Sequence, residues 1–258
     1  MTSRTHRVLA VLTVLALTSC NLVKETGRSQ LALVPEGMMA SLGLNSYTEA
    51  TSQYREITGT RDAEMVQRVG RRIAKASGRD YDWEFKLLDA PDTANAFALP
   101  GGKVAVYSGI LPITQNEDGL AAVLGHEIAH ATSHHGNERM THGIVQQLGL
   151  ATVQAALQGW SGADDQTKGE IMGALGLGAQ YGIALPFSRK HESEADEIGL
   201  RFLIRAGYDP NEAPKLWERM AKAFPDRPPE FQSTHPDPLA RAQRLRELIP
   251  RIVAEESK

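Results

Sequence analysis

This 258-residue sequence has one cysteine, no excess of positive charge and no long apolar run. The single cysteine, Cys20, excludes any disulfide within the chain. The net charge of −3 gives no indication of a nucleic-acid partner, because such a partner favours a basic domain. The apolar run from Val8 to Leu17 is too short to span a bilayer. With 41% hydrophobic residues, the chain suits one domain with a core rather than two.

The N-terminal residues have the pattern of a secretory leader. Arg4 and Arg7 precede the apolar run, which ends in Leu-Thr-Ser followed by Cys20. This ending resembles the bacterial lipobox, in which the cysteine is lipidated, so we expect residues 1–19 to be a lipoprotein signal peptide. The alternative is an ordinary secretory signal that ends near a cysteine. In enteric-type lipoprotein sorting, an aspartate directly after the lipidated cysteine signals retention in the inner membrane. This chain has Asn21 at that position, which is compatible with the outer membrane. We therefore expect a periplasmic protein that is lipid-anchored through Cys20 at the outer membrane.

His126, Glu127 and His130 form a His-Glu-x-x-His motif within a run that lacks proline and favours a helix. Histidines four residues apart lie on one helix face, and both can reach a zinc ion at about 2.0–2.1 Å. Glu127 lies near the same face, where it can act as the general base toward a water molecule. The motif also occurs by chance on helices, and a catalytic zinc site requires a third ligand.

Two places offer a third ligand. His134 and His135 follow the motif closely, but we expect them to mark the end of the helix, with a supporting role for one of them left open. A second predicted helix, over residues 188–203, has Glu192 and Asp196 on one face, where buried carboxylates would need a positive partner such as zinc or its histidines. Glu194 is a rival ligand, and we expect it to face solvent. A solvated charged face is the alternative.

Other segments predict a mainly helical domain with a small sheet. A strand is expected over 83–88, and a turn at Pro100 to Gly102 leads into a second strand. Pro100 cannot donate a backbone hydrogen bond, so we expect this hairpin at a sheet edge, where an extended peptide could pair. A purely structural hairpin is the alternative. Further helices are expected over 47–57, 62–76 (ended by Gly78), from 210 onward, through 241–248, and twice within the glycine-rich residues 141–187, with a rigid loop over 225–230.

Four motifs in order resemble the HtpX and CaaX-prenyl-protease type of zinc metallopeptidase, peptidase family M48. They begin at Asn95 (Asn-Ala-Phe-Ala-Leu-Pro-Gly-Gly), at His126, at Ser188 (Ser-Arg-Lys-His-Glu-Ser-Glu-Ala-Asp) and at Thr234 (Thr-His-Pro). The resemblance covers residues 46–250, and the small soluble lipoprotein members look most similar. It implies an α+β, zincin-like metallopeptidase domain, mainly helical, with a small edge-exposed β-sheet.

The resemblance also implies roles for individual residues. Glu192 would join His126 and His130 in binding one zinc ion per chain, and Asp196 would orient a ligand histidine. Arg241 would brace the site by pairing with a carboxylate. His235 would lie near the metal, where three roles stay open: stabilising the oxyanion, occupying the fourth zinc position, or a structural cap.

The sequence therefore predicts a zinc-dependent metalloendopeptidase that cleaves unfolded or misassembled envelope proteins, with quality control implied by the resemblance alone. The alternative is a chaperone-like assembly factor with a gated or structural zinc site. The predicted divisions are a signal peptide over 1–19, a tether over 20–46, the peptidase domain over 47–250 and a tail over 251–258. The predicted substrate-binding residues are Asn95, Ala98, Pro100, Gly101, Gly102, Val104 and Val106.

Overall fold

A computed structural model describes residues 20–149, 164, 166–167, 169, 187–223, 235 and 238–257. The chain divides into two compact units, one of residues 1–35 with 137–177 and one of residues 36–136 with 178–258. The expected signal peptide, the 225–230 loop and most of the glycine-rich stretch lie outside the described residues. No helix among the described residues is both long enough and apolar enough to cross a membrane.

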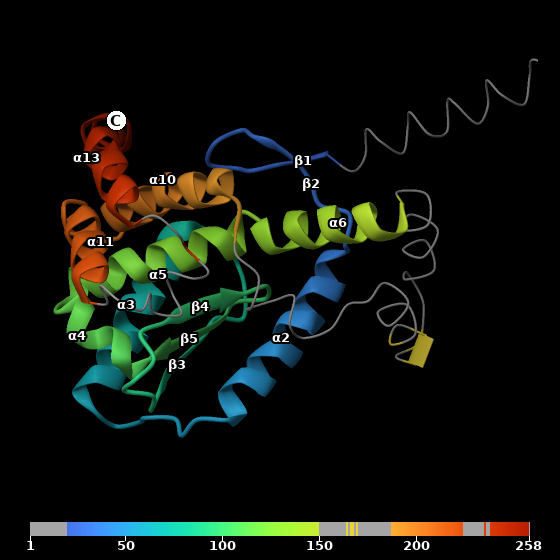
Figure 1. The fold of residues 1–258 in the computed structure, drawn as a ribbon, viewed down its shortest axis with the longest axis horizontal. Coiled ribbons are helices and arrows are strands. Elements are labelled where there is room, and N and C mark those ends of the chain that lie inside the picture. Colours follow the sequence, from blue (N-terminus) through green and yellow to red (C-terminus); the bar gives the residue numbers. More distant parts are fainter. Residues whose placement is uncertain are drawn as a thin grey trace, which may run out of the picture. The chain divides into compact units, whose positions relative to one another are not determined.

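The larger unit is mainly helical with a small sheet, as predicted (Figure 1). Over its described residues this sheet has three strands. The elements of the unit are α2 (Glu36–Ser52), α3 (Arg61–Ser77), β3 (Glu84–Leu88), β4 (Ala96–Leu99), β5 (Lys103–Tyr107), the 3-10 turn η1 (Ser108–Ile110), α4 (Leu111–Thr114), α5 (Glu117–Thr132), the start of α6 (His135–Leu148), α10 (Arg189–Arg205), α11 (Glu212–Ala223) and α13 (Pro238–Glu256). The helices predicted over 62–76 and 188–203, from 210 and through 241–248 are confirmed, as are both strands.

The strand order is β3-β5-β4, with β3 and β5 parallel and β4 antiparallel to β5. Side chains of β5 alternate between the two faces, so Val104 and Val106 lie on one face and Ala105 and Tyr107 on the other. Tyr47 of α2 packs in a core cluster with the second face. β4 forms one edge of this sheet, which agrees with an edge-exposed hairpin.

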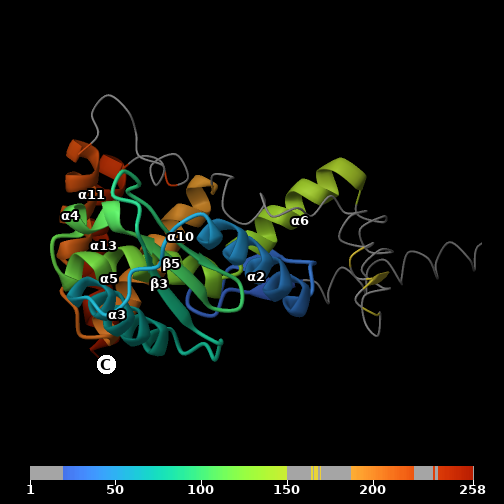
Figure 2. The same cartoon turned by 90° about the horizontal axis from the view of Figure 1, so that it is seen from below.

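α5 is the central helix of this unit, and every residue from Gly119 to Thr132 is buried. Its N-cap is Asn116, whose side chain accepts a hydrogen bond from the Gly119 backbone N–H at 2.8 Å. β4, α3, α10 and α11 all contact it, and α13 packs against α10 and α11 (Figures 1 and 2). A helix covered on all sides can hold polar side chains only where neighbouring helices supply partners.

α5 and α10 approach closely at a pair of glycines. A Cβ atom placed on Gly199 would lie 3.1 Å from both the Gly125 carbonyl carbon and the His126 backbone nitrogen. A Cβ on Gly125 would lie 2.6 Å from Leu203 Cδ1. Without side chains at Gly125 and Gly199 the two backbones can touch, and this contact carries the acidic residues of α10 to the histidines of α5.

The predicted tether over 20–46 is wrong, because residues 36–46 belong to α2, in which Met38, Met39 and Leu42 are buried. The helix predicted over 47–57 corresponds to the C-terminal third of α2, which ends at Ser52. The predicted tail is also wrong in part, since α13 continues to Glu256, where Arg201 and Arg205 form ion pairs with the Glu256 carboxylate.

The smaller unit contains a two-stranded antiparallel sheet of β1 (Cys20–Leu22) and β2 (Ser29–Leu31) together with α6 from Asn137 onward. Val34 and Asn137 exchange two hydrogen bonds: the Val34 N–H donates to Asn137 Oδ1 at 3.2 Å, and Asn137 Nδ2 donates to the Val34 carbonyl at 2.6 Å. Arg28 and Glu138 form an ion pair at 2.7 Å. Residues 20–35 therefore form ordered structure with α6 rather than a free tether.

Candidate metal centre

His126 and His130 project from the same face of α5, and their Nε2 atoms lie 3.1 Å apart. Both side chains are almost fully buried. The helix therefore directs one nitrogen of each ring toward a common point, as the four-residue spacing predicts.

Glu192 reaches the same point from the first turn of α10, which begins after the N-cap Ser188. Its Oε2 lies 3.4 Å from His126 Nε2, and its Oε1 lies 3.3 Å from His130 Nε2. Donors that surround an ion tetrahedrally at about 2.0–2.1 Å are about 3.3 Å from one another. The three donor groups thus have the spacing that a zinc ion requires.

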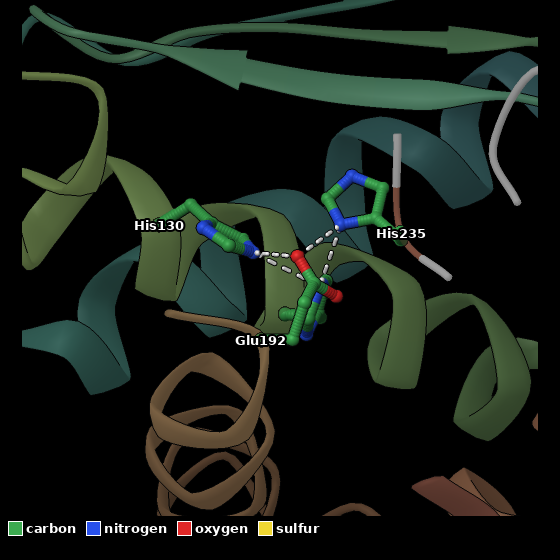
Figure 3. A group of neighbouring side chains, drawn as sticks. His130, Glu192 and His235 are labelled. Carbon is green, nitrogen blue, oxygen red and sulfur yellow. Dashed lines mark hydrogen bonds and ion pairs between the residues drawn. The ribbon is translucent and has the colours of Figure 1, made fainter. Parts of the chain in front are cut away.

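His235 completes the group, and Figure 3 shows a nitrogen of its ring directed at the Glu192 carboxylate. Its Nδ1 lies 3.1 Å from His126 Nε2 and 2.9 Å from Glu192 Oε1. His126, His130, Glu192 and His235 are all buried, and each offers a donor atom within 4.8 Å of the others. Several nitrogen and oxygen lone pairs crowd one point, where a cation would relieve their repulsion.

Glu127 lies beside this group on α5, fully buried. Its Oε1 has no hydrogen-bond partner and lies 3.4 Å from His235 Nε2. The carboxylate also receives a hydrogen bond from the Ala98 backbone, which joins it to the edge strand β4. Burial raises the pKa of Glu127 to about 7, although the electrostatic interaction with His235 opposes the shift. A carboxyl group in this range can both take and return a proton near neutral pH.

Asp196 and Arg241 fix the outer nitrogen of His126. Asp196 Oδ1 lies 3.1 Å from His126 Nδ1. Arg241 donates to Asp196 through Nη2 at 2.5 Å and Nε at 2.9 Å, and its Nη1 lies 3.0 Å from Glu192 Oε2. Burial alone would raise the pKa of Asp196, but the Arg241 guanidinium outweighs it and holds that pKa below its usual value.

Trp217 of α11 covers the other side of Arg241, with the guanidinium carbon 3.5 Å from the ring centroid. The same indole lies edge-on to the His126 ring at 5.7 Å. A desolvated cation over an indole face is held there by electrostatic attraction. We call Asp196, Arg241 and Trp217 the His126 support.

His135 and Glu194 lie on the outer side of His130. His135 Nδ1 is 3.0 Å from His130 Nδ1, and His135 Nε2 is 3.0 Å from Glu194 Oε2. His135 is fully buried and Glu194 is 8% exposed. The expectation that Glu194 faces solvent is wrong, because α6 begins at His135 and places that ring against α10. We call His135 and Glu194 the His130 support.

The charges of this centre hold Glu192 in its ionised form. Burial alone would raise the pKa of Glu192, but the electrostatic interactions with His235 and with the Arg241 guanidinium outweigh burial and lower it. Burial lowers the pKa of His130 well below its ordinary value, which favours the neutral ring. An anionic carboxylate and a neutral imidazole are the forms that bind a metal ion.

A model of peptidase family M48 matches residues 60–249. The chain belongs to this family. The mitochondrial metalloendopeptidase OMA1 of Schizosaccharomyces pombe is 42% identical over 188 residues, which are 72% of this chain and 52% of that protein. The beta-barrel assembly-enhancing proteases of Yersinia pestis and Escherichia coli are 33% and 31% identical, over 69% of this chain and 37% of each relative. The chain thus spans about half or less of the length of these curated relatives.

Membership of family M48 confirms the predicted fold class and the predicted enzyme class, a metallopeptidase. The prediction of a third donor on α10 agrees with the geometry, since Glu192 lies with both histidines of α5. The structure also brings Arg241 to Asp196, as a bracing role requires. Trp217 was not anticipated, because an aromatic residue in an amphipathic helix gives no sign beyond burial in the core.

The predicted substrate-binding residues differ in whether the structure places them where a peptide could pair. Ala98 contacts the Glu127 carboxylate. The prediction for Val104 and Val106 is wrong: both lie in β5, whose two edges are occupied by β3 and β4, so neither can pair with a peptide.

The other predicted substrate residues pack within the unit. Asn95 is buried, and its Oδ1 accepts a hydrogen bond from the Ala96 N–H. A Cβ on Gly102 would meet Tyr81 and Trp83, whereas one on Gly101 would touch Ala40 of α2, to which the turn at Pro100 is also close. These contacts assign the turn a packing role.

Proposed function

We propose that this chain is a zinc-dependent endopeptidase of the bacterial envelope, a small lipoprotein member of its family, and that it cleaves unfolded or misassembled proteins. The observation that carries the proposal is the buried donor set of His126, His130 and Glu192, with a Glu127 carboxylate oxygen beside it that accepts no hydrogen bond. Two imidazoles and one carboxylate are the protein ligands of thermolysin-like catalytic zinc centres.

When bound in this donor set, zinc would make a water molecule acidic near neutral pH and polarise the scissile carbonyl. Glu127 would then accept the water proton on its carboxylate and return it to the leaving amine. The Ala98 contact places β4 beside Glu127, so an extended substrate strand at this edge would present its carbonyl next to the base. An unfolded protein supplies such a strand more readily than a folded one.

His235 is proposed to occupy the fourth donor position and to close the centre until substrate displaces it. Its Nδ1 is as close to His126 Nε2 as His130 Nε2 is, at 3.1 Å in both cases. An oxyanion-stabilising group would need to stand back from the donor point, leaving room for the reacting atoms. The spacing favours a gating role over the two other roles considered.

A specific observation also favours the second candidate function, an assembly factor that binds envelope proteins. A centre closed by His235 could hold its ion for structure, and two relatives bear the name of proteases that enhance β-barrel assembly. The two candidates differ in their need for Glu127, which a binding protein would not use.

The deciding experiment is casein hydrolysis by the purified, zinc-loaded protein beside Glu127→Gln, with the metal content of each measured. We expect cleavage by the wild type alone, because the amide keeps the shape of the side chain but cannot accept the proton. His235→Ala should cleave faster than the wild type if His235 closes the centre. Loss of about 10²–10³ in rate would instead identify His235 as the oxyanion-stabilising group.

If the wild type holds zinc and neither it nor His235→Ala cleaves, the peptidase proposal fails. A Glu127→Gln protein that still prevents aggregation of an unfolded envelope protein as the wild type does would support the assembly factor. Lipid attachment is tested separately: palmitate should label the wild type and not Cys20→Ser, and equal labelling would contradict anchoring through Cys20.

A further inference from the structure

The polar side chains outside His130 form a continuous path that the proposed reaction does not itself use. His130 turns Nε2 toward the donor point and Nδ1 toward His135, and His135 turns its other nitrogen toward Glu194. Both steps measure 3.0 Å between the heavy atoms. These distances lie within the range of protein hydrogen bonds.

One assignment of protons satisfies every member of this path. A metal ion on His130 Nε2 requires that the ring proton stay on Nδ1, which then donates to His135 Nδ1. The His135 proton must consequently lie on Nε2, from which it donates to the Glu194 carboxylate. The path therefore ends on an anion, and no buried nitrogen or oxygen within it lacks its partner.

Ring stacking keeps both imidazoles in place. The His191 ring lies 4.7 Å from the His135 ring with an interplanar angle of 19°, and the Phe187 ring lies 3.9 Å from the His130 ring at 28°. Rotation of either imidazole would break a stack as well as a hydrogen bond. The geometry is thus fixed from the ring faces and from the ring nitrogens.

We propose that His135 and Glu194 are positioning residues that hold His130 as the Nδ1–H tautomer and aim its Nε2 at the metal. This inference rests on the proposed function, in which His130 is a ligand. Glu194 acts through His135 and touches neither the metal nor the substrate. Glu194 orients His130 as Asp196 orients His126, except that the His135 imidazole lies between the Glu194 carboxylate and the ligand histidine.

The first test measures the zinc dissociation constant of the purified full chain by competition with a chelator. Glu194→Gln and His135→Phe should each weaken zinc binding by about 10- to 100-fold. Glu197→Gln is the matched control on the same helix, because its carboxylate pairs with Arg201 and Arg251 instead. His134→Asn is the control for His135, since asparagine tolerates the positive φ of 55° at that position. Both controls should bind zinc as the wild type does.

A second readout needs no variant. Nitrogen-15 spectra of the zinc-loaded wild type, with labelled histidine, should show His130 protonated on Nδ1 and His135 on Nε2. Thermal unfolding of the metal-free variants separates positioning from simple packing: a packing role would lower the unfolding temperature and leave zinc affinity unchanged.

The inference is overturned if His135 carries its proton on Nδ1, if both variants bind zinc as the controls do, or if the wild type binds no divalent ion. Two zinc ions per chain would also overturn it, because His135 Nε2 would then be a ligand. A wild type that binds zinc with these tautomers but cleaves no protein would refute the proposed function and leave the positioning roles intact.

Discussion

The two histidines of α5 are held in different ways. The His126 support (Asp196, Arg241 and Trp217) is a charged group assembled from α10, α13 and α11, with Arg241 bonded twice to Asp196. The His130 support (His135 and Glu194) has only two members. His135 lies five residues beyond His130 in the sequence, and its ring contacts His130 through Nδ1 and Glu194 through Nε2.

The difference shows how one helix serves both histidines. Glu192, Glu194 and Asp196 occupy alternate positions of α10, so Asp196 lies about 40° and Glu194 about 200° around the helix from Glu192. All three are buried because α10 is packed on more than one side. The nearer carboxylate reaches its histidine directly, whereas the one on the far side needs His135 as a bridge. The His126 support also carries a buried cation, so we expect its loss to be the more costly.

The largest effect is expected from Arg241→Met, which breaks the His126 support. Methionine fills much of the volume but leaves Asp196 and Glu192 buried without their cation, at a cost of about 3–5 kcal/mol in the free energy of unfolding. Urea denaturation of the metal-free protein measures it. Arg246→Met on the same helix is the control, since the Arg246–Glu218 pair is exposed and worth at most about 1 kcal/mol. Equal losses in the two variants would contradict a charged support.

A smaller effect is expected from Gly199→Ala, which disturbs both supports at once by moving α10. The new Cβ would meet backbone atoms of Gly125 and His126 at 3.1 Å, and backbone cannot move aside as a side chain can. Overpacking of this kind costs about 1–3 kcal/mol. Zinc affinity should fall as well, because Glu192 moves with the helix.

Gly143→Ala is the matched control, since a Cβ there meets no atom within 4 Å. Both substitutions gain the same helix propensity, so the difference between their free energies of unfolding isolates the steric cost. A Gly199→Ala protein as stable as Gly143→Ala would show that the close approach of α5 and α10 is not needed.

The sequence predicts the His126 side of the centre better than the His130 side, for a physical reason. Asp196 follows Glu192 by one helical turn, so their shared face is visible from spacing alone. Glu194 is on the wrong face by the same rule, and its burial depends on where α6 starts after His134, whose φ is 55°. A break of this kind between two helices is set by tertiary contacts and not by helical periodicity.

The fold shows the same limit. The sequence predicts helix α3 through the helical spacing of Val66, Val69 and Ile73 and through the C-cap Gly78. In α2 the apolar residues are interrupted by serine, threonine and asparagine, so no clear stripe marks the helix. The hairpin at Pro100 is evident, but its sequence does not say that β3 pairs with the far side of β5. Strand order is a long-range property.

The smallest effect, and the sharpest comparison, is the coupling between Trp217 and Arg241. A double-mutant cycle of Trp217→Leu with Arg241→Met should give an interaction energy of about 1–2 kcal/mol in unfolding, the value of a desolvated cation–π contact. A parallel cycle of Trp217→Leu with Glu194→Gln should be additive within about 0.5 kcal/mol, because Glu194 belongs to the other support. Coupling of similar size in both cycles would mean that the supports act as one network through α5 and α10. Coupling confined to the first cycle would mean that each histidine is held independently, so that either could be loosened without the other.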